Sequence, residues 1–389
     1  MVPAALRERA LCRQNQEVTV RTLVLSPQEN RAVFDTTLDR KGIQPVWLEI
    51  ENRSPQTLWF MPVGLDRDYY PPLEVAYRSH RAGATTRRQM DAYFCTNTLP
   101  LALRPGTTNA GFAFGQILRG AKAFNVELLG TSNLLSFAFV QAVPGFKADF
   151  SRVALDRLAD PALARQCNRA ELRAELETLP AHSTDAQGTE PGDPINLVIV
   201  GSLDNVLESF VRGGWRLTEP LTTGSSWRLF KRYLLGQPYP TAPVSSLYLF
   251  GRKQDLALQR PRQSMKQRNH LRLWLTPLRC AGVPVWAGQI SRDVGVRFTL
   301  RTWHLSTHAI APDVDETRDA LMGDLLTSQV LAEVGWVKGV GPAPASAPRR
   351  NLTHDPFYTD GLRIVLFLAS EARAADELNR LNWETPPAP

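Results

Sequence analysis

Two histidines and a group of carboxylates lie within one short stretch, RTWHLSTHAIAPDVDE, at residues 301–316. In an extended strand, His304 and His308 share a face but lie roughly 13 Å apart, at about 3.3 Å per residue. A metal ion holds its ligands at about 2 Å, so a single ion does not bridge both histidines of a strand. We therefore predict no metal site and keep His308 as a candidate catalytic residue. A metal site of His308 with Asp313 or Asp315 stays open as an alternative.

The carboxylates of this stretch have a simpler interpretation as the start of a helix. Asp313 and Glu316 have the D-x-x-E spacing of an N-terminal cap, and Pro312 precedes them. Acidic residues in a first turn offset the positive helix end by about 0.3–1 kcal/mol each. The stretch thus predicts the end of a strand followed by a capped helix.

A second set of candidate residues alternates with apolar residues along three predicted strands. In RNHLRLWL the leucines share one face, and Arg268, His270 and Arg272 share the other. Arg297 in SRDVGVRF and Arg363 in GLRIVLFL alternate in the same way. If the three strands are neighbours, these side chains form one cationic surface.

The chemistry of this surface is that of anion recognition, because arginine presents a planar fork of N–H groups that matches phosphate or carboxylate. The predicted ligand-binding residues are Arg268, Arg272, Asp293, Arg297 and Arg363. Alternatively, His270 or His308 is the general base of a hydrolase acting on a phosphate or carboxylic ester. No GxSxG, P-loop or GxGxxG motif is present, and no nucleophile or cofactor is indicated. A solvated sheet face with ordinary charge pairs is the simplest alternative.

Positive charge is concentrated in one segment of the chain. Between Arg212 and Arg301 there are sixteen Lys or Arg and three acids (Glu219, Asp255 and Asp293), a net charge of +13 in a chain of net charge +7. Such a segment favours an anionic partner, such as a membrane surface or a membrane protein. Trp and Tyr lie among the arginines, as nucleic-acid stacking requires. We nevertheless do not expect nucleic acid, because no RRM, KH or helix-turn-helix pattern appears.

The first part of the chain has the pattern of β structure. Short apolar or alternating runs are separated by Gly, Pro, Asn and Ser, which predicts an antiparallel, immunoglobulin-like β-sandwich. Ser26 and Glu29 form a capping-box pattern that predicts one short helix before Phe34. The predicted strands are 17–25, 43–52, 57–63, 109–114, 123–130 and 134–143.

The second part mixes strands and helices. Residues 150–180 have helical composition, and the polar, turn-rich residues 181–193 predict a linker. Later strands and hairpins alternate with helices at 203–212, 225–236 and 315–334, which predicts a two-layer α+β domain with a largely antiparallel sheet. The predicted regions are a tail (1–16), a β-sandwich (17–149), a helical connector and linker (150–193), an α+β domain (194–370) and a second tail (371–389).

Cysteine spacing and hydropathy limit which metal sites, disulfides and membrane segments the chain can be expected to have. Cys12, Cys95, Cys167 and Cys280 are widely separated, so we predict neither a zinc site nor a disulfide framework, and a single disulfide only if the chain is exported. No run of about 18 apolar residues exists, so we predict no membrane-spanning segment. The first residues carry charges within a short apolar stretch and do not form a signal peptide as written.

The predicted second domain resembles the LssY C-terminal domain family. The resemblance covers about residues 190–370 and is carried by DPINLVIVGSLDNVLESFVRGGW, RNHLRLWLTP, PVWAGQISRDVGVRFT and NLTHDPFYTDGLRIVLFL. The segments IQPVWLEIENRS and LWFMPVGLDRDYYPPLEVAY resemble the region that precedes this domain in stand-alone members. The family has no established activity, and its domain also occurs joined to membrane segments. The resemblance implies a bacterial protein of the cell envelope, with the cytoplasm as the alternative compartment, and it favours a non-enzymatic anion-binding protein over the hydrolase.

Overall fold

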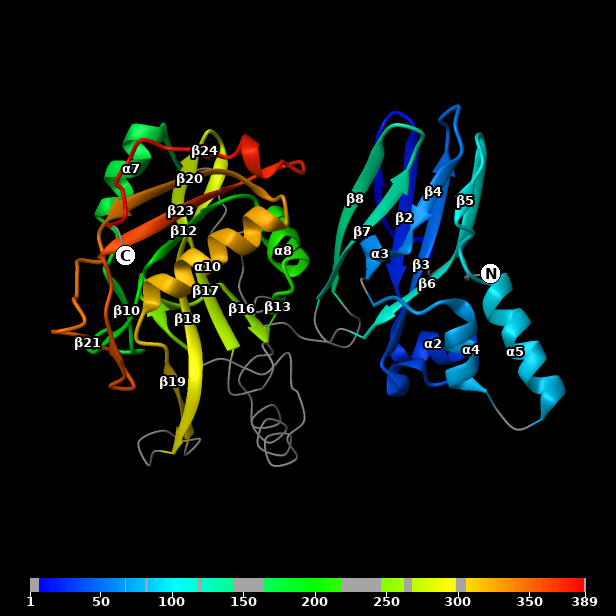
Figure 1. Ribbon diagram of the computed structural model, residues 1–389, viewed down its shortest axis with the longest axis horizontal. Coiled ribbons are helices and arrows are strands. Elements are labelled where there is room, and N and C mark those ends of the chain that lie inside the picture. The colour runs from blue at the N-terminus through cyan, green and yellow to red at the C-terminus, as the bar shows by residue number, and fades with distance from the viewer. Residues whose placement is uncertain are drawn as a thin grey trace. The chain divides into compact units, whose positions relative to one another are not determined.

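The computed structural model describes residues 7–66, 68–80, 83–117, 121–142, 164–217, 246–261, 268–298 and 306–387 (Figure 1). The chain divides into two compact units, residues 1–146 and 147–389. Both units mix strands with helices, so the predicted α+β class is confirmed. Within the described ranges, no helix is long and apolar enough to cross a membrane.

The first unit contains two four-stranded antiparallel sheets. One has the order β1 (Leu11–Gln14), β2 (Val18–Val24), β3 (Ile43–Asn52), β6 (Thr107–Gln116). The other has the order β5 (Ala102–Leu103), β4 (Leu58–Met61), β7 (Ala121–Leu129), β8 (Leu134–Ala142). Alternate residues of both sheets, such as Val20 and Leu48 in one and Val126 and Phe139 in the other, share one hydrophobic core. The specific immunoglobulin-like topology stays a prediction.

Helices cover a second core in this unit. The predicted short helix is α2 (Pro27–Phe34), and its capping box is present, with the Glu29 backbone N–H donating to Ser26 Oγ at 3.2 Å. A 3₁₀ turn follows at Leu38–Lys41. Three further helices in the described part of this unit were not predicted. These helices are α3 (Pro62–Leu65), α4 (Pro72–Ser79) and α5 (Ala84–Thr96). An aromatic cluster around Phe34 and Phe94 packs with two of them, α4 and α5.

The second unit is built on one large mixed sheet. Its order is β13-β16-β17-β18-β12-β23-β20-β24, with β19 paired to β18 and β9 paired to β17. Only the pairs β9–β17, β12–β23 and β20–β24 are parallel among the described strands. The bounds are β9 (Arg165–Cys167), β12 (Leu197–Val200), β13 (Arg216–Leu217), β16 (Leu256–Pro261), β17 (Arg268–Cys280), β18 (Val283–Phe298), β19 (Ser306–Ile310), β20 (Leu331–Lys338), β23 (Leu362–Leu368) and β24 (Asn379–Arg380).

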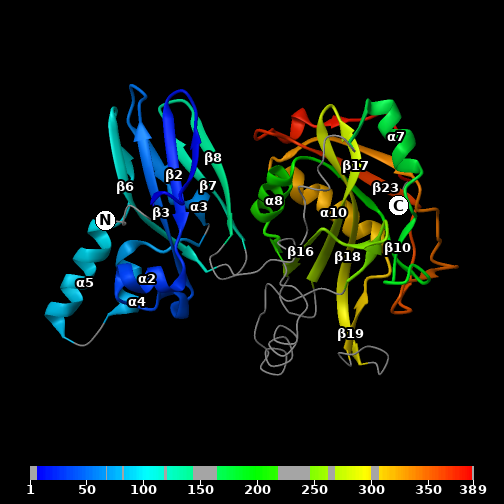
Figure 2. The ribbon, with the colours of Figure 1, turned by 180° about the vertical axis from the view of Figure 1, so that it is seen from behind.

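Helices lie on both faces of this sheet. On one face lies α7 (Arg169–Glu177) (Figure 2). Its Leu172 and Leu176 share a hydrophobic core with Val198 and Val365 of the central strands. On the other face, α10 (Val314–Thr327) crosses β18 and β23 (Figure 1). The predicted helix after residue 202 is α8 (Leu203–Arg212), and Ser202 Oγ accepts from the Asn205 N–H at 3.1 Å.

Several sequence predictions need correction in this unit. The predicted linker instead forms β10 (His182–Thr184) and β11 (Pro191–Pro194), which join β14 (Tyr248–Leu249) and β15 (Arg252–Lys253) in a small sheet. The helix predicted to residue 334 ends at Thr327, and β20 begins at Leu331. A further short pair is β21 (Arg349–Arg350) with β22 (Pro356–Phe357), and a 3₁₀ turn spans Ala375–Glu377. The helix predicted at 225–236, and residues 150–163 of the predicted connector, lie outside the described residues.

A buried polar cluster as candidate functional site

Strand β17 places three basic side chains on one face of the large sheet. In the antiparallel pairing of β17 with β18, His270 lies opposite Ser291 and Arg272 lies opposite Gln289. Directly opposed residues share a face, so the polar residues of the two strands face the same side. The alternation in RNHLRLWL therefore predicted this arrangement correctly, since Leu271 and Leu273 lie on the opposite face.

Burial of these side chains was not predicted. Arg268, His270 and Arg272 are only 2%, 7% and 6% exposed, and Asp293 is 3% exposed. The sequence had suggested either an open cationic surface or a solvated sheet face. Both interpretations are wrong for these residues, because the cluster lies in the interior of the unit.

His270 and Asp293 form a close pair at the centre of the cluster. The distance between His270 Nε2 and Asp293 Oδ2 is 2.6 Å. Burial lowers the pKa of His270, although the nearby Asp293 carboxylate opposes that shift. A neutral histidine that donates its Nε2–H to a carboxylate has Nδ1 as its basic atom. The pair therefore fixes the tautomer and the orientation of a potential general base.

Arg272 connects the cluster to β11. Its guanidinium donates to Gln289 Oε1 at 2.7 Å and lies 3.9 Å from Asp193 Oδ2. Asn351 in turn donates to Asp193 Oδ1 at 2.8 Å. Burial raises the pKa of Asp193 and lowers that of Arg272, because each charged form loses hydration. Arg272 and Asp193 thus form a loose buried ion pair, longer than a hydrogen-bonded one.

Polar atoms of two glutamines complete the cluster. Arg268 donates to Gln259 Oε1 at 3.1 Å, and burial lowers the pKa of Arg268. Gln289 is fully buried, and its Nε2 has no hydrogen-bond acceptor in the described part of the chain. Among the described residues, the cluster contains Arg268 and Arg272 with Asp193 and Asp293, so these formal charges cancel while His270 is neutral. The cluster can therefore hold a polar or anionic group without a large excess of positive charge in the empty state.

Arg363 is engaged elsewhere in the interior. It is fully buried, and burial lowers its pKa to about 10. None of its hydrogen-bond acceptors in the described part of the chain belongs to the cluster. Its guanidinium donates to the backbone carbonyls of Leu176, Leu179, Pro180, Ile195 and Gly339. Arg363 therefore anchors the end of α7 to the sheet, and a ligand-binding role for it receives no support from these contacts.

Arg297 and His308 are placed by backbone pairing alone. Strand β18 continues beyond a register shift between Asp293 and Gly295, and there Val296 pairs with His308 and Arg297 pairs with Thr307. The side chains of Arg297 and His308 lie outside the description. The backbone brings these two residues to neighbouring positions on adjacent strands, and their proposed roles stay predictions.

The stretch before α10 is a strand end and a helix cap, as predicted. Asp313 Oδ1 accepts from the N–H groups of Asp315 and Glu316 at 3.0 and 3.1 Å. Asp315 also lies 3.2 Å from Arg318, a fully buried residue that forms a second ion pair with Asp360 at 2.9 Å. These carboxylates are thus occupied by local structure. Within the described ranges, no three metal-ligating side chains gather at one point.

Sequence reasoning missed Asp193, Gln259, Gln289 and Asn351. Asp193 and Asn351 come from segments that have no apolar periodicity, and only their side-chain contacts connect them to β17. Gln259 and Gln289 had a usable signal, since both lie opposite basic residues of β17 in an antiparallel register.

Fold and cluster together define the class of this protein. It is an α+β protein with a β-rich first unit and a second unit whose mixed sheet holds a buried histidine, aspartate and arginine cluster. Residues 174–362 match the family model described as LssY C-terminus. The second unit therefore contains an LssY C-terminal domain, preceded by a β-rich region, and the cluster on β17 and β18 lies within the match. No curated protein matches the chain.

Proposed function

We propose that the buried polar cluster is a binding site for a small anionic group, a phosphate or a carboxylate. The observation that carries this proposal is the burial of Arg268, His270 and Arg272 at alternate positions of one strand. Burying charged side chains costs several kcal/mol per ion and rarely improves stability over apolar packing. Ligand recognition therefore explains why charged side chains are buried here, whereas a contribution to folding stability does not.

Arg272 and Gln289 are the proposed primary contacts. The 3.9 Å separation leaves the Arg272–Asp193 pair weaker than a hydrogen-bonded pair, so an anion can compete with Asp193 for the guanidinium. Gln289 Nε2 supplies a buried donor beside it. A phosphate oxygen held by both would satisfy a polar atom whose burial is otherwise costly.

The phosphate in question belongs either to a free metabolite or to a lipid head group that enters the unit. The cluster does not suit docking of the whole sheet face onto a flat anionic membrane. Such docking needs exposed charges, and the basic side chains of β17 are buried. Association with the cell envelope, or with a membrane-protein partner, rests on the basic segment between Arg212 and Arg301 and on the family resemblance, and stays a prediction.

Thermal unfolding in the presence of inorganic phosphate tests the proposal. Phosphate should raise the Tm of the wild type and of Arg292→Gln, and leave Arg272→Gln unchanged. Arg292 is the matched control, because it lies on the same pair of strands but forms its ion pair with Glu316 of α10 at 2.8 Å. Equal shifts in all three proteins, or no shift in any, would refute the site.

Vesicle co-sedimentation separates the two sources of the phosphate. Phosphatidic acid vesicles should pellet the wild type more than phosphatidylcholine vesicles do, if a lipid head group is the ligand. The Arg272→Gln variant should lose that preference. A Tm shift with phosphate but no pelleting identifies a free phosphate compound instead.

A second candidate function is hydrolysis of a phosphate or carboxylic ester, and the 2.6 Å contact between His270 and Asp293 favours it. In this function His270 Nδ1 removes a proton from water as the water attacks, and the arginines stabilise the developing negative charge. With p-nitrophenyl phosphate or acetate, His270→Gln should lower turnover by about 10²–10⁴-fold while unfolding stays cooperative. Equal turnover in both proteins would exclude His270 as the base.

A further inference from the structure

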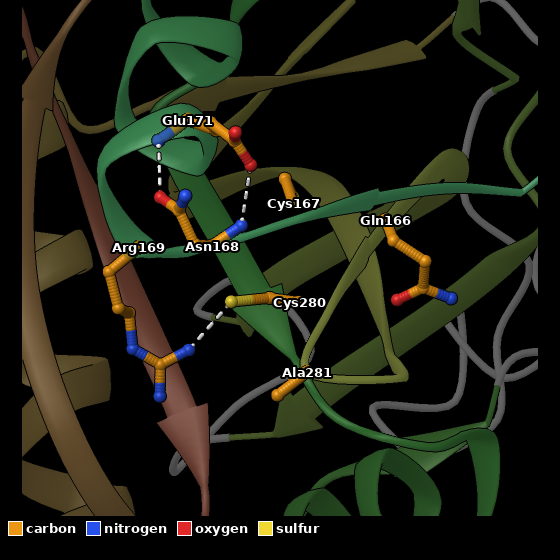
Figure 3. Close-up of a pocket in the computed structure, with 7 residues that line it drawn as sticks. All are labelled: Gln166, Cys167, Asn168, Arg169, Glu171, Cys280 and Ala281. Carbon is orange, nitrogen blue, oxygen red and sulfur yellow. Dashed lines mark hydrogen bonds between the residues drawn. The ribbon is translucent and has the colours of Figure 1, made fainter.

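Two cysteines far apart in the sequence lie directly opposite each other in the second unit. In the parallel pairing of β9 with β17, Cys167 is the register partner of Cys280. Both are buried and belong to the hydrophobic core beneath α7 (Figure 3). Cys167 Sγ also lies 3.1 Å from the carbonyl oxygen of Arg279, the residue adjacent to Cys280.

Their separation suits a disulfide. Neighbouring strands lie about 4.7–4.9 Å apart, and disulfides join Cα atoms separated by roughly 4.4–6.8 Å. Directly opposed side chains share a face, so neither strand needs to rotate to bring the sulfurs together. Burial raises the pKa of the Cys167 thiol, and the neighbouring Cys280 contributes in the same direction, consistent with close approach.

The surroundings favour reaction at Cys280. An open hollow of about 560 Å³ is lined by the two cysteines and by the start of α7 (Figure 3). Arg169 donates to Cys280 Sγ at 2.7 Å, and a guanidinium at that position stabilises negative charge that develops on the sulfur. Arg169 is itself held by a two-point ion pair with Glu333, at 2.8 and 3.2 Å, and by the ring of Phe367 at 4.0 Å.

We propose that Cys167 and Cys280 are a dithiol pair that forms a reversible disulfide by exchange with a disulfide oxidant. The Cys280 thiolate attacks one sulfur of the oxidant, forms a mixed disulfide and releases one thiolate. The Cys167 thiolate then attacks Cys280 Sγ and displaces the second thiolate. Two protein thiols become one disulfide, the oxidant becomes two thiols, and the two protons of the protein thiols pass to the released thiolates.

The disulfide would fasten β9 to the β17–β18 hairpin and enclose residues 168–279, which include β12, β13, β16 and nearly all of β17. A cross-link around so long a loop restricts the unfolded chain strongly. The oxidised protein is therefore more resistant to heat than the reduced protein. This inference does not depend on the proposed anion site, because no residue of the pair belongs to that cluster.

The test uses the full chain with Cys12→Ser and Cys95→Ser, which removes the two exposed cysteines and leaves the pair. The protein is treated with oxidised glutathione without denaturant and then alkylated. We expect loss of both thiols, a mass decrease of about 2 Da relative to the reduced protein, a peptide pair linking Cys167 to Cys280, and a Tm rise of about 5 °C or more.

Matched variants separate the intramolecular disulfide from other oxidation. Adding Cys167→Ser should stop the reaction at a glutathione adduct on Cys280, and adding Cys280→Ser should abolish the cross-link. Retention of both thiols after treatment, a persistent glutathione adduct in the parent protein, or cross-linking only in denaturant would overturn the proposal. The parent protein alone is decisive if the serine variants fail to fold.

Discussion

Lowering the pH from 7.5 to 5.5 should destabilise the second unit through His270. Burial lowers the pKa of this histidine, with Arg268 and Arg272 acting in the same direction and Asp293 opposing. In the unfolded chain its pKa returns to about 6.5. Below that value the unfolded state binds a proton that the folded state does not bind, so stability falls as the pH falls.

The magnitude follows from proton linkage. For one histidine that stays neutral in the folded state, the loss between pH 7.5 and 5.5 approaches about 1.4 kcal/mol. The His270→Gln variant lacks this contribution, while other groups with shifted pKa values, such as Asp193, titrate equally in both proteins. The free-energy difference between the wild type and the variant should therefore shrink by about 1 kcal/mol on acidification.

Urea unfolding at the two pH values measures this difference. Buried tryptophans of the second unit report on its unfolding, and two of them, Trp274 and Trp286, lie on the strands that carry the cluster. His182→Gln is the control substitution, because His182 is exposed and lies outside the cluster. Identical pH dependence in the wild type and His270→Gln, or a steeper loss in the variant, would refute the reasoning.

Three further substitutions test the structural assignments, each by urea unfolding. Asp313→Ala removes the cap of α10 and should cost about 1 kcal/mol, whereas no loss would contradict the cap. Arg318→Met removes a fully buried cation from the partly buried acids Asp315 and Asp360 and should cost about 3–5 kcal/mol; restoration by Asp360→Asn would support the pairing. Gly111→Ala places a methyl group against the backbone of Leu99 and should cost about 1–3 kcal/mol in the first unit, and a neutral effect would exclude that close approach.

Local pattern predicted those parts of the fold that depend on neighbours in sequence. Alternation identified the polar face of β17, and capping chemistry identified the starts of α2 and α10. Alternation does not distinguish a covered polar face from a solvated one, because the strand has the same pattern in both cases. Burial of Arg272 depends on β11, and the turn-rich sequence around β11 had predicted a linker.

The helices of the first unit also depend on contacts that local sequence pattern does not predict. Residues 65–74 contain two prolines and several acids, a composition that is typical of a loop, yet Pro72 is the first residue of α4. Proline is tolerated at that position because its missing N–H would be unbonded there in any case. α5 has no clear apolar stripe in the sequence pattern, and aromatic contacts of Phe94 with Phe34 of α2 and with Phe114 of β6 help to hold it against the unit.

Charge balance in the buried cluster has a consequence for ligand binding. Two arginines are offset by Asp193 and Asp293, so an entering anion brings the site to net negative charge unless a proton enters with it. Asp193 and His270 are the available acceptors, since burial already raises the pKa of the first, and a nearby anion would raise the pKa of both. Anion binding in this site should therefore take up a proton, and the phosphate-induced rise in Tm should be larger at pH 6 than at pH 8. A rise that is independent of pH would mean that the anion binds outside the cluster.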